Sequence, residues 1–317
     1  MQHIPRDSTY MACLTDFICR EYAIEPVSIT PAKRGYYGET WRLDTADGNY
    51  FLKLDYSPKH QTRYKNSLPV VGYLTESGID FIGKIIKTRS GRLFSVYDSA
   101  VLGVFTWIDG ENIETDETKI PEYKMLSKIY LLTKPGFDIP TLEFSDKTAL
   151  TFFAKWNNLK AEPQSEENSA IISIFEQYRK ALTDYAARLS YFASVCDNDR
   201  SDFYITHGDA GGNLLSGGGK YYIVDWDEVM YAPLERDAWV MCCRDWARKA
   251  FGDALAHNNI HYTLRPERLA FFCYHMFFLY LVEFLDDFTL FGKRREIEEY
   301  FDGFIMERTR YADTILP

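Results

Sequence analysis

Apolar and polar positions follow different spacings along the chain, and the spacing predicts where helices and strands lie. Apolar side chains recur at helical spacing over residues 8–22, with Leu14 and Ile18 on the same side, which indicates an amphipathic helix. Beyond Pro26 the apolar runs become short and β-like, and Asp47-Gly48 is a typical hairpin turn. This pattern predicts strands at residues 27–29, 40–43 and 50–54.

Short elements continue to residue 108. A helix is predicted over residues 59–77, followed by strands at 81–86 and 92–97 that we expect to form a hairpin-like pair. An apolar strand over 101–108 then leads into Asp109-Gly110, where turn residues interrupt the pattern. We therefore expect residues 1–108 to form a small antiparallel sheet with a helix.

Helical spacing predominates after residue 109. The most apolar stretch, Leu269–Leu285, contains His275 and Glu283 and is too short and interrupted for a membrane span, so we expect a core helix there and no membrane partner. Residues 109–317 are expected to form a mainly helical lobe. Helices are predicted at residues 123–132, 145–160, 168–196, 236–251, 265–291 and 293–311.

A stretch between residues 205 and 240 carries two acidic clusters on either side of a predicted hairpin. Asp209 and Asn213 precede the hairpin, Asp225 follows it, and three glycines at 217–219 supply its turn. A hairpin holds the loops at its two ends side by side, so an Asp and an Asn from the first loop face an Asp from the second. Oxygen ligands of this kind suit a hard cation such as Mg²⁺.

The charge balance limits the partners of this chain. Its 317 residues carry a net charge of -10, with 46 Asp and Glu against 36 Lys and Arg. Binding to nucleic acid requires a basic surface, so the balance argues against that class of partner. It is compatible with a small cationic substrate.

The six cysteines lack CxxC or other metal-binding spacing, which indicates free thiols in a reducing compartment. We therefore expect a cytoplasmic protein. No obligatory protein partner is evident from the sequence.

Two motifs connect these loops with a known family. The sequence HGD ending at Asp209, with Asn213 after it, and the sequence IVDWD around Asp225 resemble the catalytic and metal-binding loops of the aminoglycoside phosphotransferase and choline kinase superfamily. The continuation to Asp237 is most similar to spectinomycin phosphotransferases. The resemblance implies an α/β (α+β), two-lobed, protein-kinase-like fold, with a small antiparallel-sheet N-lobe and a larger, mainly helical C-lobe.

The resemblance also implies roles for the two loops. Asp209 corresponds to the catalytic base, and Asn213 and Asp225 correspond to the Mg²⁺ ligands. The family places five residue steps between the catalytic Asp and the Asn, whereas Asp209 and Asn213 are four steps apart. The small residues between them, Ala210-Gly211-Gly212, leave the loop enough freedom to bring Asn213 to the metal.

The N-lobe is expected to bind the nucleotide. Lys53 lies in an apolar strand, where an unpaired charge is costly, at the place of the lysine that holds nucleotide phosphates in the family. A lysine on the solvent face of an edge strand is the alternative reading of the same pattern. Gly35 and Gly38 lie in a loop that could cover the phosphates. The resemblance places the hinge, which binds adenine through its backbone, at Phe105, Thr106, Trp107 and Ile108, and an ordinary core strand fits the same pattern equally well.

One expected partner of Lys53 is absent from the sequence. In kinases the helix after this strand supplies a Glu that pairs with the lysine. Residues 58–74 contain no Asp or Glu, and Glu76 lies close to the end of the predicted helix. Either another acid pairs with Lys53, or the lysine is held in a different way.

These observations predict an ATP-dependent O-phosphotransferase, with GTP as a possible donor. The acceptor is expected to be a hydroxyl group of an aminoglycoside or aminocyclitol antibiotic such as spectinomycin, and Asp227 and Glu228 are candidates for contacts with its ammonium groups. Two alternatives remain open. One is a metabolic kinase for choline, an amino alcohol or a sugar, and the other is a nucleotide-binding protein without turnover.

Overall fold

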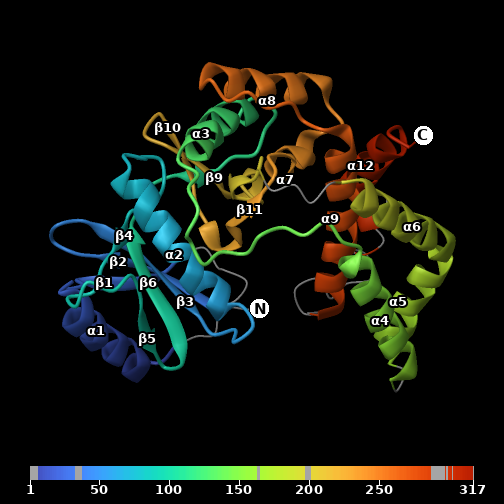
Figure 1. Cartoon of the computed structure of the whole chain (residues 1–317). Helices are drawn as coiled ribbons and strands as arrows, with labels where there is room; N and C mark the ends of the chain where they lie inside the picture. Colours follow the sequence, from blue (N-terminus) through green and yellow to red (C-terminus); the bar gives the residue numbers. More distant parts are fainter. Residues whose placement is uncertain are drawn as a thin grey trace. The chain divides into compact units, whose positions relative to one another are not determined.

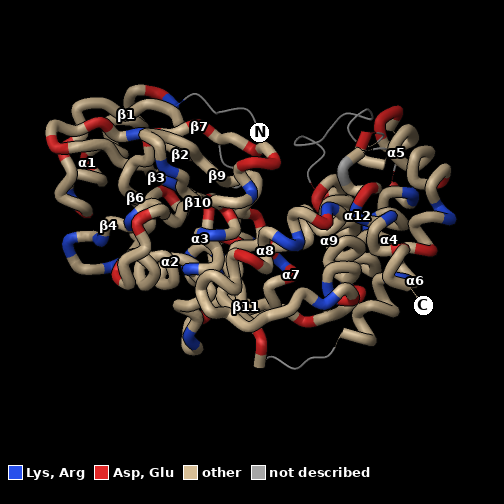
Figure 2. Tube along the Cα trace, turned by 90° about the horizontal axis from the view of Figure 1, so that it is seen from above, with Lys and Arg blue, Asp and Glu red and all other residues tan. Residues whose placement is uncertain are grey.

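The computed structural model describes residues 6–32, 38–162, 165–196, 201–286, 297, 299–301 and 303–316. The chain divides into two compact units, each assembled from two separate parts of the sequence. Unit 1 consists of Met1–Thr141 and Tyr204–Tyr231, and unit 2 consists of Leu142–Phe203 and Ala232–Pro317. The division into residues 1–108 and 109–317 expected from the sequence is a division into lobes, and it stays a prediction. Basic and acidic residues are distributed over both units (Figure 2).

Unit 1 contains an antiparallel sheet of long and short strands, which includes the strands predicted for the N-terminal part of the chain (Figure 1). The order of its strands is β1-β2-β3-β6-β4, and β5 also pairs with β6. The predicted hairpin-like pair of residues 81–86 and 92–97 is therefore wrong, because both strands pair with the longer β6 and not with each other. The strands are β1 (Ser28–Pro31), β2 (Gly38–Asp44), β3 (Asn49–Asp55), β4 (Ile85–Ile86), β5 (Ser95–Tyr97) and β6 (Ala100–Thr106).

Helix α1 (Ser8–Tyr22) covers one face of this sheet. Its first residue follows Asp7, whose side chain accepts a hydrogen bond from Tyr10 N–H and so satisfies a free donor at the helix start. The predicted apolar side of the helix, Leu14 and Ile18, is fully buried against alternate residues of β3 and β6. The amphipathic helix predicted over residues 8–22 is confirmed.

Helix α2 (Gln61–Glu76) contacts the same sheet through β4 and β6. Because side chains alternate across a strand, Lys53 of β3 lies on the opposite face from the buried Leu52 and Leu54. Lys53 is in register with Gly103 of β6, and a Cβ atom on Gly103 would lie only 2.3 Å from the hydroxyl oxygen of Tyr64 in α2. A glycine at this position lets α2 approach the sheet beside Lys53.

The second part of unit 1 contains the predicted hairpin. Strands β9 (Leu214–Gly217) and β10 (Lys220–Ile223) are antiparallel and joined by Gly218 and Gly219, both with positive φ. Two residues of this kind form the tight turn that matches strand twist, so the predicted hairpin is confirmed. Strand β7 (Glu111–Asn112) pairs with β9, and strand β8 (Tyr204–Thr206) pairs with β11 (Met230–Ala232). Helix α3 (Lys119–Leu131) follows β7 in the chain and precedes the other strands.

The regular elements described in unit 2 are helices, apart from Ala232 at the end of β11, and loops connect them. The single helix predicted over residues 168–196 is wrong, because Tyr178, with φ -95° and ψ 8°, separates two helices. The apolar spacing is similar on both sides of Tyr178, so the sequence pattern did not reveal the break. The described helices are α4 (Lys147–Ala161), α5 (Glu166–Gln177), α6 (Arg179–Val195), α7 (Glu235–Ala238), the 3-10 turn η3 (Trp239–Met241), α8 (Asp245–His257), α9 (Pro266–Asp286) and α12 (Phe304–Asp313).

The helix predicted over residues 236–251 is also interrupted. Arg244 is extended, with φ -107° and ψ 115°, and it separates the short turn of α7 and η3 from α8. By length and composition α9 could cross a membrane, but 56% of its most apolar window is buried within the protein. Its fully buried residues include Phe271 and Phe277, as expected for the core helix predicted from the sequence.

Candidate active site

The hairpin register places Asn213 beside Asp225. Leu214 pairs with Ile223 across the two strands, and the Val224 N–H donates a hydrogen bond of 3.0 Å to the Asn213 carbonyl. Asn213 and Val224 therefore lie opposite each other at the open end of the hairpin, and Asp225 follows Val224 directly. The structure thus brings together the two residues predicted to bind Mg²⁺.

The short loop between Asp209 and Asn213 brings their side chains into direct contact. It closes through one turn of 3-10 helix, η1 (Gly211–Asn213). The Asn213 side-chain amide donates to the Asp209 carboxylate at 2.9 Å and to the Asp209 carbonyl at 2.8 Å. A Cβ atom on Gly211 would lie 2.5 Å from the ammonium nitrogen of Lys119, so a larger residue there would displace the end of the Lys119 side chain.

The imidazole ring of His207 supports this loop through hydrogen bonds at both of its nitrogens. The ring Nδ1 accepts a hydrogen bond of 3.2 Å from Asp209 N–H, so Nε2 carries the proton and donates to the Val224 carbonyl at 3.0 Å. The ring is fully buried and packs edge-on against Trp226 at 4.6 Å between centroids. His207 therefore connects the Asp209 loop with the strand before Asp225 and has no exposed nitrogen for chemistry.

Asp225 has a backbone conformation that is unusual for its residue type. Its φ of 62° and ψ of 68° lie in the left-handed region. A residue with a Cβ atom pays about 1–2 kcal/mol for this conformation. Such strain persists where the surrounding structure fixes it, and it is common at functional sites. The conformation starts the 3-10 turn η2 (Trp226–Glu228), so the chain reverses immediately after Asp225.

Lys53 pairs with two carboxylates of the Asp225 segment. Its Nζ lies 2.7 Å from an oxygen of Asp225 and 2.5 Å from an oxygen of Asp227. The Lys53 side chain is only 14% exposed, so the alternative of a lysine on a solvent-facing edge is excluded. This pairing answers the question left by the sequence, because the acids that hold Lys53 come from the metal-binding loop and not from α2.

Burial and charge shift the pKa values of this group in opposite directions. Burial disfavours the charge on Asp225, but the Lys53 ammonium outweighs it and lowers the pKa of Asp225 below its usual value. Burial raises the pKa of Asp227 to about 6, against the opposing effect of Lys53. Burial also raises the pKa of Asp209, which suits a carboxylate that takes part in proton transfer.

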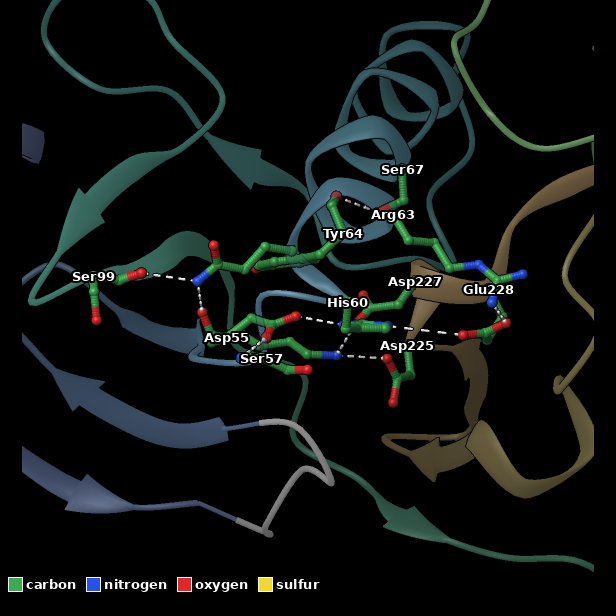
Figure 3. Close-up of polar contacts among 12 residues, drawn as sticks. Asp55, Ser57, His60, Arg63, Tyr64, Ser67, Ser99, Asp225, Asp227 and Glu228 are labelled. Atoms are coloured by element: carbon green, nitrogen blue, oxygen red, sulfur yellow. Dashed lines mark hydrogen bonds and ion pairs between the residues drawn. The ribbon is translucent and has the colours of Figure 1, made fainter. Parts of the chain in front are cut away.

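Arg63 of α2 and His60, the residue before α2, place two basic side chains beside Asp227 and Glu228 (Figure 3). Arg63 lies 2.6 Å from Glu228, and His60 is hydrogen-bonded to Asp55 while its other nitrogen faces Asp227 and Glu228 at 3.9 and 3.8 Å. Burial alone would lower the pKa of His60, but the hydrogen bond to Asp55 and the other acids raise it to about 9, so the ring is charged at neutral pH.

No motif in the sequence singled out His60 or Arg63. Their positions, three apart at the start of the helix predicted over residues 59–77, could have indicated a basic side facing the acidic loop. Asp227 and Glu228, predicted to contact an ammonium group of the substrate, are engaged by Lys53 and Arg63 in this structure, and their substrate role stays a prediction.

Three of the predicted nucleotide-binding positions, Gly38, Phe105 and Thr106, pair with residues of β3, the strand that carries Lys53. Gly38 begins β2 opposite Asp55, and a Cβ atom there would lie 1.7 Å from the Leu54 carbonyl oxygen. Gly35 lies outside the described residues. In the predicted hinge, Thr106 N–H donates to the Lys84 carbonyl at 2.9 Å and Trp107 N–H donates to the Asn49 carbonyl at 3.0 Å. The adenine contact of the segment from Phe105 to Ile108 stays a prediction.

Comparison with known proteins assigns this site to a family. The profile of the phosphotransferase enzyme family matches residues 28–272, which include both loops and Lys53. The chain belongs to the phosphotransferase enzyme family. It is an enzyme of the kinase type, with an alcohol group as acceptor. No match was found among curated proteins.

Solved structures of phosphotransferases have the same fold. Spectinomycin phosphotransferase in complex with ADP and spectinomycin is 19% identical, with a TM-score of 0.77 over 98% of each chain. Amicoumacin kinase in complex with AMP-PNP, Ca²⁺ and its antibiotic is 12% identical, with a TM-score of 0.62 over 98% of this chain and 94% of that one. Choline kinase from Streptococcus pneumoniae is 14% identical, with a TM-score of 0.54 over 97% and 100%. The expected two-lobed, protein-kinase-like α+β fold is confirmed.

The residues at this phosphotransferase site fit a magnesium ion. Asp225 and Asn213 offer only oxygen atoms, because the Asn213 amide nitrogen is used by Asp209. No group of three His, Cys, Asp or Glu residues suited to a metal ion occurs in the part of the chain that the structure describes. Mg²⁺ in phosphotransferases is commonly held by one or two protein oxygens together with substrate phosphates, so two ligands are sufficient.

Proposed function

We propose that this phosphotransferase transfers the γ-phosphoryl group of ATP to a hydroxyl group of an aminoglycoside or aminocyclitol antibiotic. The observation that carries the proposal is the convergence of Asp209, Asn213, Asp225 and Lys53. A carboxylate, an amide, a second carboxylate and an ammonium group are the components that phosphoryl transfer requires, because catalysis of this reaction consists of positioning and charge stabilisation.

Each side chain has a distinct task in this mechanism. Asp209 orients the acceptor hydroxyl and accepts its proton, and its raised pKa makes it a stronger base than a carboxylate with the ordinary pKa. The amide of Asn213 fixes the Asp209 carboxylate through the bond of 2.9 Å. Lys53 neutralises the charge of the phosphates. Asn213 and Asp225 would hold Mg²⁺, which when bound stabilises the negative charge on the transferred group.

Several observations support a cationic acceptor. The net charge of -10 attracts cations, and the fold is similar to that of spectinomycin phosphotransferase and amicoumacin kinase. The likeness to choline kinase supports the second candidate, a metabolic kinase for choline, an amino alcohol or a sugar. We further propose that the protein acts in the cytoplasm, where ATP is available and where its free cysteines remain reduced.

A panel of acceptors with γ-labelled ATP tests this function. Spectinomycin, other aminocyclitols, aminoglycosides, choline, amino alcohols and neutral sugars are each incubated with the protein and Mg²⁺, and transfer of label is measured. We expect an antibiotic of the first two classes to be labelled, and the Asp209→Asn variant to remove this labelling while ADP still binds. Labelling of choline or a sugar alone would favour the second candidate. Nucleotide binding without labelling of any acceptor would favour a protein without turnover.

A further inference from the structure

Helix α2 lies against the acidic turn η2. The helix contributes basic side chains to this site, whereas the corresponding helix of kinases contributes an acid. In kinases the helix supplies a Glu and the neighbouring strand supplies the lysine. Here the described helix α2 has no acid before Glu76, and His60 and Arg63 at its start face Asp227 and Glu228. Figure 3 shows these side chains in one row between α2 and the acidic turn.

Asp227 connects the helix with the lysine. One carboxylate oxygen of Asp227 lies 2.5 Å from Lys53 Nζ and 3.9 Å from His60 Nε2. Asp227 is 7% exposed, so its carboxylate has little water to stabilise it and depends on these cations. Removing the charge on either side would leave this buried carboxylate with only part of its compensation, which is more costly than the loss of an exposed pair.

Asp225 and Asp227 differ in the tasks they can perform for Lys53. Asp225 also pairs with Lys53, but its carboxylate is the predicted metal ligand and is needed elsewhere during turnover. Asp227 is held on its other side by α2, and its neighbour Glu228 is held by Arg63 at 2.6 Å. Of the two carboxylates, Asp227 is therefore the one placed to keep Lys53 oriented when phosphates bind.

We propose that Asp227 orients the phosphate-binding lysine Lys53 in this enzyme, and that His60 and Arg63 of α2 are positioning residues that act on Lys53 through the acidic turn. The contact between α2 and η2 replaces the pair of a helix Glu with the strand lysine. This inference rests on the proposed function, because it assigns these residues to nucleotide binding at the same site.

The geometry favours this role over that of a simple surface contact. His60 is tied through its other ring nitrogen to Asp55, which lies two residues after Lys53 in β3. Asp55 is 1% exposed and also accepts a hydrogen bond of 2.8 Å from Ser57 N–H. The end of β3, the start of α2 and the turn η2 are thus joined by one row of charged side chains, with Lys53 at the end of that row.

A charge-swap experiment tests the contact between α2 and the acidic turn. The affinity for ADP with Mg²⁺ is measured by calorimetry on the full chain for Arg63→Glu, Glu228→Arg and the variant with both changes. We expect each single change to weaken binding about three- to thirtyfold, the range that coupling through such networks spans, and the double change to restore much of the loss. Lys65→Ala is the control, because Lys65 lies in α2 near Phe94 and away from η2, and it should bind ADP like the wild type.

A second comparison distinguishes a positioning role from a merely structural one. If His60 and Arg63 act through Lys53, then Arg63→Gln should weaken ADP binding in the wild-type background but not further in a Lys53→Met background. Equal losses in both backgrounds would overturn the inference, and so would unchanged ADP affinity in Arg63→Gln and His60→Gln. The conservative glutamines keep the helix intact, and equal melting temperatures would verify folding.

The two proposals fail in different ways. If the wild-type protein binds no ADP with Mg²⁺, the proposed function is overturned and the inference falls with it. If the wild type binds ADP and phosphorylates an acceptor, but the variants of α2 bind ADP equally well, then only the inference is overturned. Asp227→Asn should lower ADP affinity at least as much as Arg63→Gln, because it removes the charge that contacts Lys53 directly.

Discussion

At the scale of single residues, the bond between Asp209 and Asn213 places the predicted base and one predicted metal ligand in the same fixed group. An amide that donates to a carboxylate holds it without neutralising its charge. The carboxylate therefore keeps its ability to accept a proton while its orientation is determined. The effect of the Asp209 charge can be separated from the effect of its shape, because asparagine has nearly the same shape and lacks the charge.

We predict that Asp209→Asn lowers kcat about 10²–10⁴-fold, the usual contribution of a positioned base. The carbonyl oxygen of the new side chain can still accept the hydrogen bond from Asn213, so the loop should keep its form. The affinity for ADP should stay within about twofold of the wild type, since phosphate contacts come from Lys53 and the metal ligands. Steady-state kinetics with an identified acceptor checks the first expectation, and unchanged kcat would contradict it.

The sequence allowed some of these residues to be predicted and not others. Asp209, Asn213 and Asp225 stand in two motifs that lie close together along the chain, and Lys53 stood out as a charge within an apolar strand. His60 and Arg63 are separated from Glu228 by more than 160 positions, and their contact depends on how α2 packs, which no local pattern contains. For the same reason the sequence left open which acid, if any, pairs with Lys53.

At the scale of elements, the hairpin of β9 and β10 determines where the two loops meet. Its register fixes the Asn213 carbonyl on Val224 N–H, so the loop before it has to span a set distance from Asp209. Four residue steps are sufficient because η1 is tightly wound. The shorter spacing, which departs from the family pattern, is thus matched to the hairpin.

We predict that one glycine inserted between Gly211 and Gly212 lowers kcat about 100-fold. Asn213 is held by the hairpin, so the added residue moves Asp209 away from it, and a displacement of about 1 Å at a reacting group can cost that much. A glycine inserted after Asp47, in the exposed turn before β3, serves as the control and should leave kcat nearly unchanged. Wild-type activity of the loop insertion would show that the four-step spacing is not required.

Helix α9 contains a histidine whose burial makes the stability of the protein depend on pH. His275 stacks on Phe271 at 5.2 Å, and burial, with a smaller effect of Arg236, lowers its pKa to about 4. The ordinary pKa of histidine is about 6.5. Between these values the unfolded chain binds a proton that the folded protein does not, so stability is lost as the pH falls.

We predict a loss of about 3 kcal/mol from the free energy of unfolding between pH 6.5 and pH 4 through His275, at about 1.4 kcal/mol per pH unit. The variant His275→Phe lacks this proton and should show a correspondingly smaller slope over the same range. Denaturant unfolding of both proteins at intervals of half a pH unit measures the difference. Parallel slopes would indicate that His275 is charged or exposed in the folded protein.

The boundaries of long helices were predicted less well than their existence. Periodicity identified α1 and α9, because each has one continuous apolar side. It did not separate α5 from α6, because the apolar residues Ile174 and Leu182 keep helical spacing across Tyr178. The break is accompanied by stacking of Tyr178 on Phe301 at 4.2 Å, a tertiary contact between residues more than 100 positions apart.

At the scale of the whole molecule, the net charge of -10 bears on the choice of acceptor. If exposed carboxylates attract a cationic acceptor, added salt screens this attraction, with a Debye length of about 10 Å at 0.1 M and about 3 Å at 1 M. Lys53 is nearly buried, so its contact with phosphates is screened less.

We predict that raising NaCl from 0.05 to 0.5 M, concentrations that span roughly this screening range, increases the KM of the acceptor more than the KM of ATP. Initial rates at both salt concentrations, with each substrate varied in turn, provide the measurement. A neutral analogue of the acceptor is the control, since its KM should not respond to charge screening. Equal responses of the charged and neutral acceptors would count against an antibiotic held by carboxylates.

The interleaving of the two units has a consequence for how the protein can be made. The chain passes from one unit to the other three times, and Asp209 and Asp225 belong to the same unit as residues near the N-terminus. During synthesis the first 141 residues emerge without this catalytic segment, which follows only after 62 residues of unit 2. No single cut of the polypeptide can therefore separate unit 1 from unit 2, because any fragment with both parts of unit 1 also carries residues 142–203 of unit 2. Nascent chains that end before residue 231 lack part of unit 1.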